Sequence, residues 1–159
     1  MPRHPSQTAE MRLRARTDAD CARLAGVWAA SWREAMPDTD FEARRPWFLD
    51  HLRALEAAGA ITICAFDGAN RLLGFVTFDP ATAYLDQLAV APEAKGSGAA
   101  HLLVAEARRR SPNGLVLDVN QDNARALAFY GREGFAKIAE GVNPRSGLKT
   151  WRLRWPGSA

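Results

Sequence analysis

A glycine-rich turn between a strand-like segment and a helical segment has the residues best suited to bind an anion. Leu88, Ala89 and Val90 end an apolar run, Pro92 breaks it, and a helical pattern follows the glycines. Glycine lacks a Cβ, so a ligand can approach the backbone N–H groups closely. The first N–H groups of a helix lack intrahelical acceptors and lie at its positive end, which favours an anion such as a pyrophosphate. The turn consists of Lys95, Gly96, Ser97, Gly98, Ala99 and Ala100.

Two other phosphate-binding patterns fit this turn poorly. The P-loop needs a lysine directly after its last glycine, whereas Lys95 precedes both glycines. The dinucleotide fingerprint needs a small residue where His101 stands, and it needs a βαβ unit in place of three successive strands. Asp118 does lie about twenty residues further on, where that fingerprint has an acid. A tight turn that needs glycine only for its backbone conformation is the simplest alternative.

The turn and a second stretch together resemble the GNAT superfamily of acyl-CoA-dependent N-acetyltransferases. Its pyrophosphate-binding pattern, (Q/R)xxGx(G/A), falls on residues 95–100, where Lys95 replaces the usual glutamine or arginine. The stretch LDVNQDNARALAFYGREGF is similar to the motif that follows in the family. The two motifs cover about residues 85–135, and the order of elements extends the resemblance toward Met11. The matching residues are Gly98, Ala100, Asn123, Tyr130, Gly134 and Phe135.

This resemblance implies that the chain binds acetyl-CoA and transfers its acetyl group directly to a primary amine. The pantetheine arm would lie along residues 87–90, and an N–H of Leu88 or a neighbour would polarise the thioester carbonyl. A bulge in that strand would free such N–H groups. The pyrophosphate would meet the N–H groups of residues 95–100. Asn123 would either contact the cofactor or cap a helix.

Tyr130 and Asp118 are the residues expected to move protons. A phenol is protonated at neutral pH and can donate to a departing thiolate, which is the role that the resemblance implies for Tyr130. Taken alone, Tyr130 is better explained as a core aromatic. Asp118 is the expected general base, provided that burial or a neighbouring anion raises its pKa. A solvated or salt-bridged carboxylate is an equal alternative for Asp118.

Asp86 and Tyr84 on the preceding strand are further alternatives for the base. They are two residues apart, so they are expected on one face of the strand, opposite Leu85 and Gln87. Asp86 is also expected near the acceptor amine, although a solvated carboxylate explains it as well. His51 and His101 have no partner pattern in the sequence.

The acceptor site is expected between the first two helices and the late hairpin, as the resemblance implies. Trp28 and Trp32 lie one turn apart on one helix face. An aromatic wall would suit an amine, and Arg33 would suit a carboxylate on the acceptor. A core position for both tryptophans and a solvated Arg33 are the alternatives.

The elements that must position these residues form one α/β (α+β-like) domain with a mixed, mostly antiparallel twisted sheet and about four flanking helices. Thr17 is expected to cap the first helix, and Pro37 to follow its end. Three strands in succession argue against a doubly wound array. The hydrophobic pattern predicts strands at 11–16, 60–66, 71–78, 83–90, 114–120, 136–141 and 148–154, and helices before 37, at 41–58, at 98–110 and at 123–134.

Composition excludes several other classes of protein. The 159 residues are 47% hydrophobic and 25% charged, with a net charge of +3, which fits one globular domain. The basic residues are scattered, so nucleic acid is not an expected partner. No apolar run approaches the ~18 residues of a membrane span, so a membrane is not expected either. Two distant cysteines indicate reduced thiols and a cytoplasmic protein, and no Cys/His cluster has the spacing of a metal site. Residues 1–10 are expected to be a flexible leader before a single domain at 11–156.

Two other functions and one assembly remain compatible with the sequence. A non-catalytic acyl-CoA-binding or regulatory module of the same fold is compatible with the replacement by Lys95. A Rossmann-like nucleotide binder is the third hypothesis. A homodimer is compatible with WRLRW, which puts Trp151 and Trp155 on one strand face, although that face would pack on the core equally well.

Overall fold

A single seven-stranded sheet organises the protein, whose computed structural model describes residues 10–158. The predicted leader therefore lies outside the described residues except for Glu10. The strand order is β1-β2-β3-β4-β5-β7-β6, and every neighbouring pair is antiparallel except β4 and β5. The strands are β1 (Arg12–Ala15), β2 (Ile61–Phe66), β3 (Leu72–Asp79), β4 (Tyr84–Val90), β5 (Leu115–Asn120), β6 (Ala136–Val142) and β7 (Lys149–Trp155).

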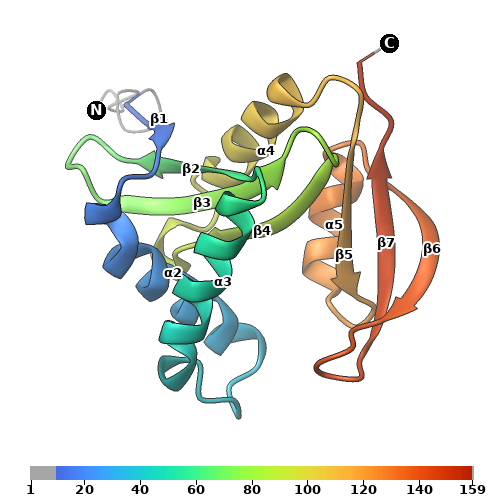
Figure 1. Ribbon diagram of the computed structural model, residues 1–159, viewed down its shortest axis with the longest axis horizontal. Helices are drawn as coiled ribbons and strands as arrows, with labels where there is room; N and C mark the ends of the chain where they lie inside the picture. The colour runs from blue at the N-terminus through green and yellow to red at the C-terminus, as the bar shows by residue number, and fades with distance from the viewer. Residues whose placement is uncertain (1–9, 159) are drawn as a thin grey trace, which may run out of the picture.

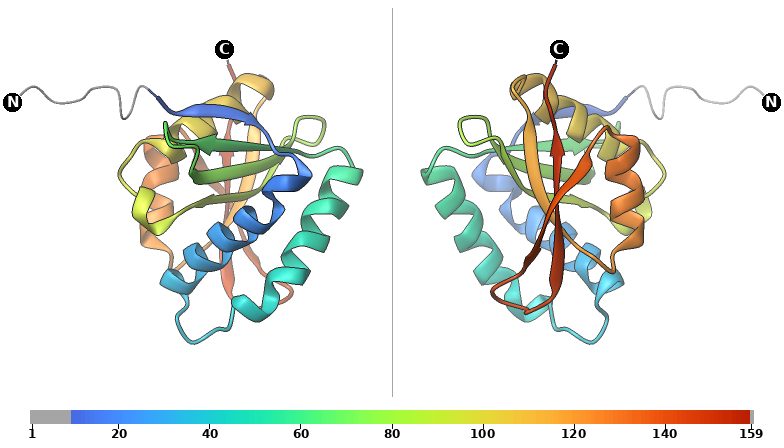
Figure 2. Two further views of the ribbon diagram at one scale, coloured as in Figure 1. Left: turned by 90° about the vertical axis from the view of Figure 1, so that its left-hand side faces the viewer. Right: turned by 90° about the vertical axis from the view of Figure 1, so that its right-hand side faces the viewer.

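Helices cover both faces of the sheet (Figures 1 and 2). Helices α2 (Cys21–Ala35) and α3 (Arg45–Ala57) pack on one face, in a core cluster that includes Phe48 and Phe75. Helices α4 (Ala99–Arg110) and α5 (Ala124–Arg132) pack on the other face, in a cluster that includes Leu103. Single 3-10 turns are η1 (Asp18–Asp20), η2 (Glu42–Arg44) and η3 (Pro92–Ala94). The predicted fold class is confirmed.

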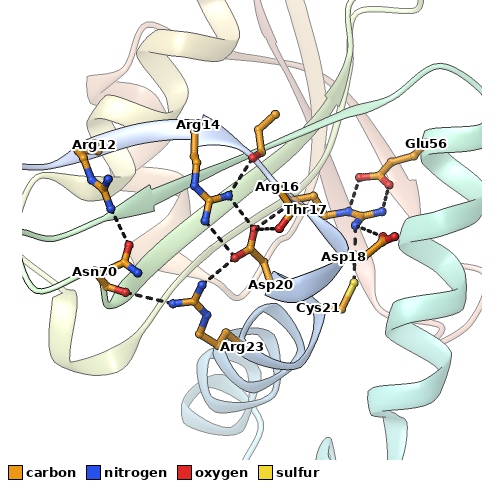
Figure 3. A network of polar contacts seen from close by, with 11 residues as sticks. Arg12, Arg14, Arg16, Thr17, Asp18, Asp20, Cys21, Arg23, Glu56 and Asn70 are labelled. Atoms are coloured by element: carbon orange, nitrogen blue, oxygen red, sulfur yellow. Dashed lines mark hydrogen bonds and ion pairs between the residues drawn. The ribbon is translucent and has the colours of Figure 1, made fainter.

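The start of α2 is fixed by a buried carboxylate (Figure 3). The backbone N–H and hydroxyl of Thr17 both donate to Asp20, at 2.8 and 3.1 Å, which closes the predicted cap at the start of the helix. Arg14 of β1 donates to both oxygens of Asp20, and Arg23 of α2 adds a bond of 2.7 Å. Asp20 is 1% exposed, so its charge is compensated entirely by these neighbours. The cluster ties β1 to the first turns of α2.

The sheet divides into two halves between β4 and β5. One residue pair, Tyr84 with Val116, joins these parallel strands, and Val116 also donates from its N–H to Ala83. Beyond this point the two strands diverge, as Figure 1 shows. The β5-facing backbone groups of β4 after Leu85 therefore lack a strand partner among the described residues.

The last strand contributes to the core. Trp151 and Trp155 of β7 are partly buried against the cluster that includes Leu103. The structure thus favours the core position over an exposed tryptophan face. None of the helices in residues 10–158 is long and apolar enough to cross a membrane.

Candidate active site

The turn at residues 95–100, called the anion cradle below, has the backbone form of an anion site. Gly96 and Gly98 have φ of 81° and 92°, a region that side chains rarely adopt. A Cβ at either position would meet no protein atom within 4 Å, so packing does not account for these glycines. The N–H groups of Gly96, Gly98 and Ala100 have no acceptor among residues 10–158. These groups stand at the N-terminus of α4 and can receive an anion.

The side chain of Lys95, the first residue of the cradle, is held in an ion pair. Its Nζ donates to both carboxylate oxygens of Glu34 on α2, each at 3.0 Å. The sequence led us to expect a cation available to phosphate, whereas the structure shows one already neutralised by an acid 61 positions away.

Strand β4 carries the predicted bulge. Thr77 of β3 pairs with Gln87 and Phe78 pairs with Leu85, so Asp86 is an extra residue in β4. A bulge of this kind turns backbone groups out of the ladder and re-aims side chains. Residues 88–90 follow it along the edge that diverges from β5, next in the chain to the anion cradle.

The bulge brings Asp86 to His51 of α3. Nε2 of His51 lies 3.0 Å from Oδ2 of Asp86, and the side chains are 23% and 21% exposed. Nε2 of Gln87 also lies 3.3 Å from Oδ2, so Gln87 shares the side of Asp86. The expectation that Gln87 faces away from Asp86 is therefore wrong, because the extra residue breaks the alternation of the strand.

An aromatic side chain covers the ring of His51. Trp47, one helical turn earlier on α3, stacks on it with ring centres 4.9 Å apart and planes at 11°. Arg145, in the turn between β6 and β7, places its guanidinium carbon 4.3 Å from the centre of the Trp47 ring. The late hairpin thus contacts α3 beside the His51–Asp86 pair.

Asp118 lies in an ion pair where β4 and β5 meet. Arg152 of β7 donates to both of its oxygens at 3.0 and 3.1 Å, and the Tyr84 hydroxyl donates to it at 2.7 Å. The hydrogen bond from Arg152 lowers the pKa of Asp118 below its ordinary value. Burial, and then the bond to Asp118, raises the pKa of Tyr84. A base needs the opposite shift, so the alternative of a salt-bridged carboxylate fits Asp118 better.

Tyr130 is buried on α5 between two aromatic rings. The ring centres of Phe129 and Phe135 lie 5.2 and 5.4 Å from its own, both in edge-on contact. Burial raises the pKa of Tyr130, so the phenol keeps its proton at neutral pH. Asn123 caps the same helix by accepting from the N–H of Ala126 at 3.1 Å, which bears out the capping alternative.

A model of the acetyltransferase (GNAT) family matches residues 22–135, which contain β4, the anion cradle and Tyr130. The chain belongs to this family. The match confirms the family predicted from the two motifs, and it spans both halves of the divided sheet.

Curated relatives of this GNAT domain are acetyltransferases of different acceptors. The peptidyl-lysine N-acetyltransferase YiaC of Escherichia coli K12 is 34% identical over 87 residues, 55% of this chain and 58% of that protein. The mycothiol acetyltransferase of Salinispora tropica is 35% identical over 136 residues, 77% of this chain and 39% of that protein. The chain thus matches about half the length, or less, of these relatives.

Among solved structures, the PaiA N-acetyltransferase of Thermoplasma acidophilum, determined in complex with coenzyme A, shares the fold. Its TM-score is 0.72 at 18% identity, and the alignment covers 89% of this chain and 97% of that chain. At this identity the likeness concerns the fold alone.

The predicted acceptor residues of this GNAT domain separate into different environments. Trp28 is 3% exposed and stacks on Phe48 at 4.8 Å, so it is a core residue. Trp32 is half-buried and stacks on Phe41 at 5.8 Å. Arg33 is exposed, 3.8 Å from Glu42, and lines a cavity of about 300 Å³ in the link between α2 and α3. Within residues 10–158, no group of three or more His, Cys, Asp or Glu side chains could hold a metal ion.

Neither His51 nor Trp47 was predicted as a site residue from the sequence. Their partners lie 35 and about a hundred positions away, on β4 and in the last hairpin, and local spacing carries no sign of either contact. The spacing of four between Trp47 and His51 on one helix face was the only local signal.

Proposed function

We propose that the protein transfers an acetyl group from acetyl-CoA to a primary amine. The observation that carries this proposal is the junction of two features. The edge of β4 diverges from β5 after one residue pair, and the next turn along the chain exposes unpaired N–H groups at the start of α4. Membership of the acetyltransferase family supports it.

The residues present fit the cofactor. The space beside Gly96 and Gly98 contains no protein atom where a Cβ would stand, so a pyrophosphate has room against the backbone. Residues 88–90 would hold the pantetheine arm by backbone hydrogen bonds along the free edge of β4. Acetyl-CoA supplies the electrophilic thioester carbonyl. An N–H of Leu88 or a neighbour would stabilise negative charge on the carbonyl oxygen.

Tyr130 is the proposed proton donor to the leaving sulfur. Its buried phenol retains its proton at neutral pH, which a general acid requires. Asp118 was the base expected from the sequence. Its ion pair with Arg152 makes it a weak base, and we propose instead that Asp118 holds β4, β5 and β7 together at the mouth of the divided sheet.

The proposed acceptor is a small-molecule amine or a peptide amine. The relative YiaC is named for peptidyl-lysine, which supports a lysine side chain as one member of that class. We also propose a cytoplasmic location, with neither nucleic acid nor a membrane as partner. Cys21 and Cys64, both free and buried, support a reducing compartment. A homodimer remains compatible with this function.

Calorimetric titration with acetyl-CoA tests the cofactor, with NAD and ATP as controls. We expect micromolar binding of acetyl-CoA and much weaker binding of the controls. Absence of heat at millimolar acetyl-CoA would remove the support for the proposal. Preferential binding of NAD would favour a nucleotide-binding function instead.

Release of free thiol tests the reaction. The acceptors would be a lysine peptide with blocked ends, a dipeptide with a free N-terminus and n-butylamine. Tyr130→Phe separates an enzyme from a non-catalytic module, because it removes only the hydroxyl. We expect turnover to fall by about 10²-fold while acetyl-CoA binding stays unchanged. Binding without thiol release from any acceptor would favour the module.

A further inference from the structure

Resting on the proposed acetyl transfer, we propose that His51, oriented by Asp86, accepts the proton that an ammonium acceptor must lose before it attacks. Asp86 is the extra residue of the β4 bulge, two positions before Leu88 on the strand expected to hold the cofactor. His51 reaches it from α3, on the face of the sheet opposite α5 and Tyr130. The base and the acid are thus carried by helices on opposite faces of the sheet.

The contacts of His51 leave one ring nitrogen able to accept a proton. An ionised carboxylate can only accept, so the bond of 3.0 Å between Nε2 and Asp86 places the ring proton on Nε2. Nδ1 then carries a lone pair, and it has no hydrogen-bond partner among residues 10–158. Trp47 stacks on the ring and limits its rotation. The arrangement is that of a base whose tautomer is set by a carboxylate.

Imidazole suits this step better than the other groups nearby. The ordinary pKa of imidazole is about two units higher than that of a carboxyl group. It is therefore closer to the pKa of an alkylammonium, which is about 10. Both oxygens of Asp118 are engaged by Arg152, and the hydroxyl of Tyr84 donates to Asp118. The Asp86 carboxylate, 3.0 Å from Nε2, stabilises the imidazolium that forms.

The protons balance as follows. The ammonium gives one proton to Nδ1 of His51, and the neutral nitrogen forms a bond to the acetyl carbon as the bond from that carbon to sulfur breaks. The sulfur takes a proton from the Tyr130 hydroxyl, and the second proton of the amine nitrogen restores Tyr130. Imidazolium then releases its proton to water. One ammonium and one thioester thus give one amide, one thiol and one proton.

Several charged and titratable groups lie on the elements around the pair. Asp86 contacts His51 directly. The charge of Asp86 also contributes to the raised pKa of Tyr84. The others are Asp118 of β5 with Arg152 of β7, Arg145 of the β6–β7 turn, and Asp50 and Arg53 on α3.

The pH dependence of His51→Gln tests the proposal, with the best acceptor of the thiol-release panel. We expect kcat/KM to fall by about 10²-fold at pH 7 and the loss to shrink as rising pH supplies neutral amine from solution. Acetyl-CoA binding by calorimetry should stay unchanged. His101→Gln is the matched control, because His101 also pairs with a carboxylate, Glu133, at 2.9 Å. The control should keep its activity across the pH range.

Asp86→Asn and nitrogen-15 NMR of the imidazoles provide a readout that does not depend on turnover. We expect His51 of the wild type to be protonated on Nε2 alone when neutral, and Asp86→Asn to show a mixture of tautomers. Asp86→Asn should also lose about tenfold in kcat/KM.

Three results would overturn the proposal: His51→Gln as active as the wild type, a loss that is the same at every pH, or a pH-dependent loss in Asp118→Asn instead. A wild type that binds acetyl-CoA and releases no thiol would overturn the proposed function itself.

Discussion

The hydroxyl of Tyr84 donates to Asp118 over 2.7 Å at the one point where β4 and β5 pair. Asp118 in turn receives two bonds from Arg152, so a chain of side chains crosses β4, β5 and β7 at the origin of the divergence. We propose that these bonds hold β4, β5 and β7 together where the proposed cofactor would enter the divided sheet.

The Asp118–Arg152 pair should contribute modestly to stability, and only above acidic pH. Its side chains are partly exposed, so a cycle of Asp118→Asn and Arg152→Gln should give a coupling of about 0.5–1 kcal/mol at pH 7 by urea denaturation. The pKa of Asp118 is lowered by folding, so the coupling should be present above its ordinary value of 3.8 and lost as pH falls below it. The exposed pair Asp50 and Arg53, 3.8 Å apart, should show none. Equal coupling in the two pairs would contradict this account.

Asp20→Asn should lower the free energy of unfolding far more than the nearby substitution Asp18→Asn. Asp20 is buried with Arg14 and Arg23 against it, as Figure 3 shows, and its pKa is lowered chiefly by the bond from Arg14. Removing its charge leaves two guanidinium groups uncompensated, so we expect a loss of about 3 kcal/mol in the free energy of unfolding. Asp18 is 97% exposed, so Asp18→Asn should lower the free energy of unfolding by less than about 0.5 kcal/mol.

The Asp20 contribution should also vanish in acid. Because folding depresses this pKa, the stabilisation is complete above about pH 4 and falls away as pH drops toward the folded value. The difference in thermal stability between the wild type and Asp20→Asn should therefore shrink steadily as pH falls below 3.8. A difference that does not shrink over this range would mean that the charge is not the source of the stabilisation.

Gly98→Ala should weaken acetyl-CoA binding more than it weakens the fold. The Cβ would meet open space, but φ of 92° strains any side chain by about 1 kcal/mol, and the methyl would project where a phosphate must approach. Gly147→Ala is the matched control, since Gly147 has φ of 73°, the same open space and a position in the β6–β7 turn. We expect both to lose similar stability, and only Gly98→Ala to lose at least tenfold in affinity by calorimetry.

Local patterns predicted the elements well because each strand and helix has its own hydrophobic period. The strand bounds agree with the structure to within one residue, from Arg12 in β1 to Trp155 in β7. The glycine turn was found because its chemistry lies in contiguous residues. Contacts such as His51 with Asp86 or Lys95 with Glu34 join elements far apart in the chain, and the bulge at Asp86 shifts the alternation on which the strand faces were assigned. Period and spacing carry no information about such pairs.

Glu34→Gln should strengthen acetyl-CoA binding. Lys95 Nζ is held by both oxygens of Glu34, and removing that negative charge leaves the ammonium free for the phosphates. A partly exposed pair is worth up to about 1 kcal/mol, so the affinity should rise by about two- to fivefold, with a steeper dependence on salt. Glu93→Gln, an acid in η3 on the same approach to the cradle, is the control and should change the affinity less. An unchanged or weaker affinity in Glu34→Gln would mean that Lys95 does not reach the cofactor.

Truncation of Trp28 should mainly lower stability, whereas truncation of Trp47 should mainly lower activity. Trp28 is 3% exposed and packs on Phe41 and Phe48, so Trp28→Ala should cost about 3–5 kcal/mol in stability. Trp47 is 40% exposed, yet it stacks on His51, so Trp47→Ala should cost about 1 kcal/mol in stability. It should mainly raise KM for the amine and lower kcat, because the His51 ring loses the surface that orients it. Chemical denaturation and thiol-release kinetics measure the two effects separately. If Trp47→Ala leaves both kinetic constants unchanged, the ring does not depend on this contact, and Asp86 alone must orient His51.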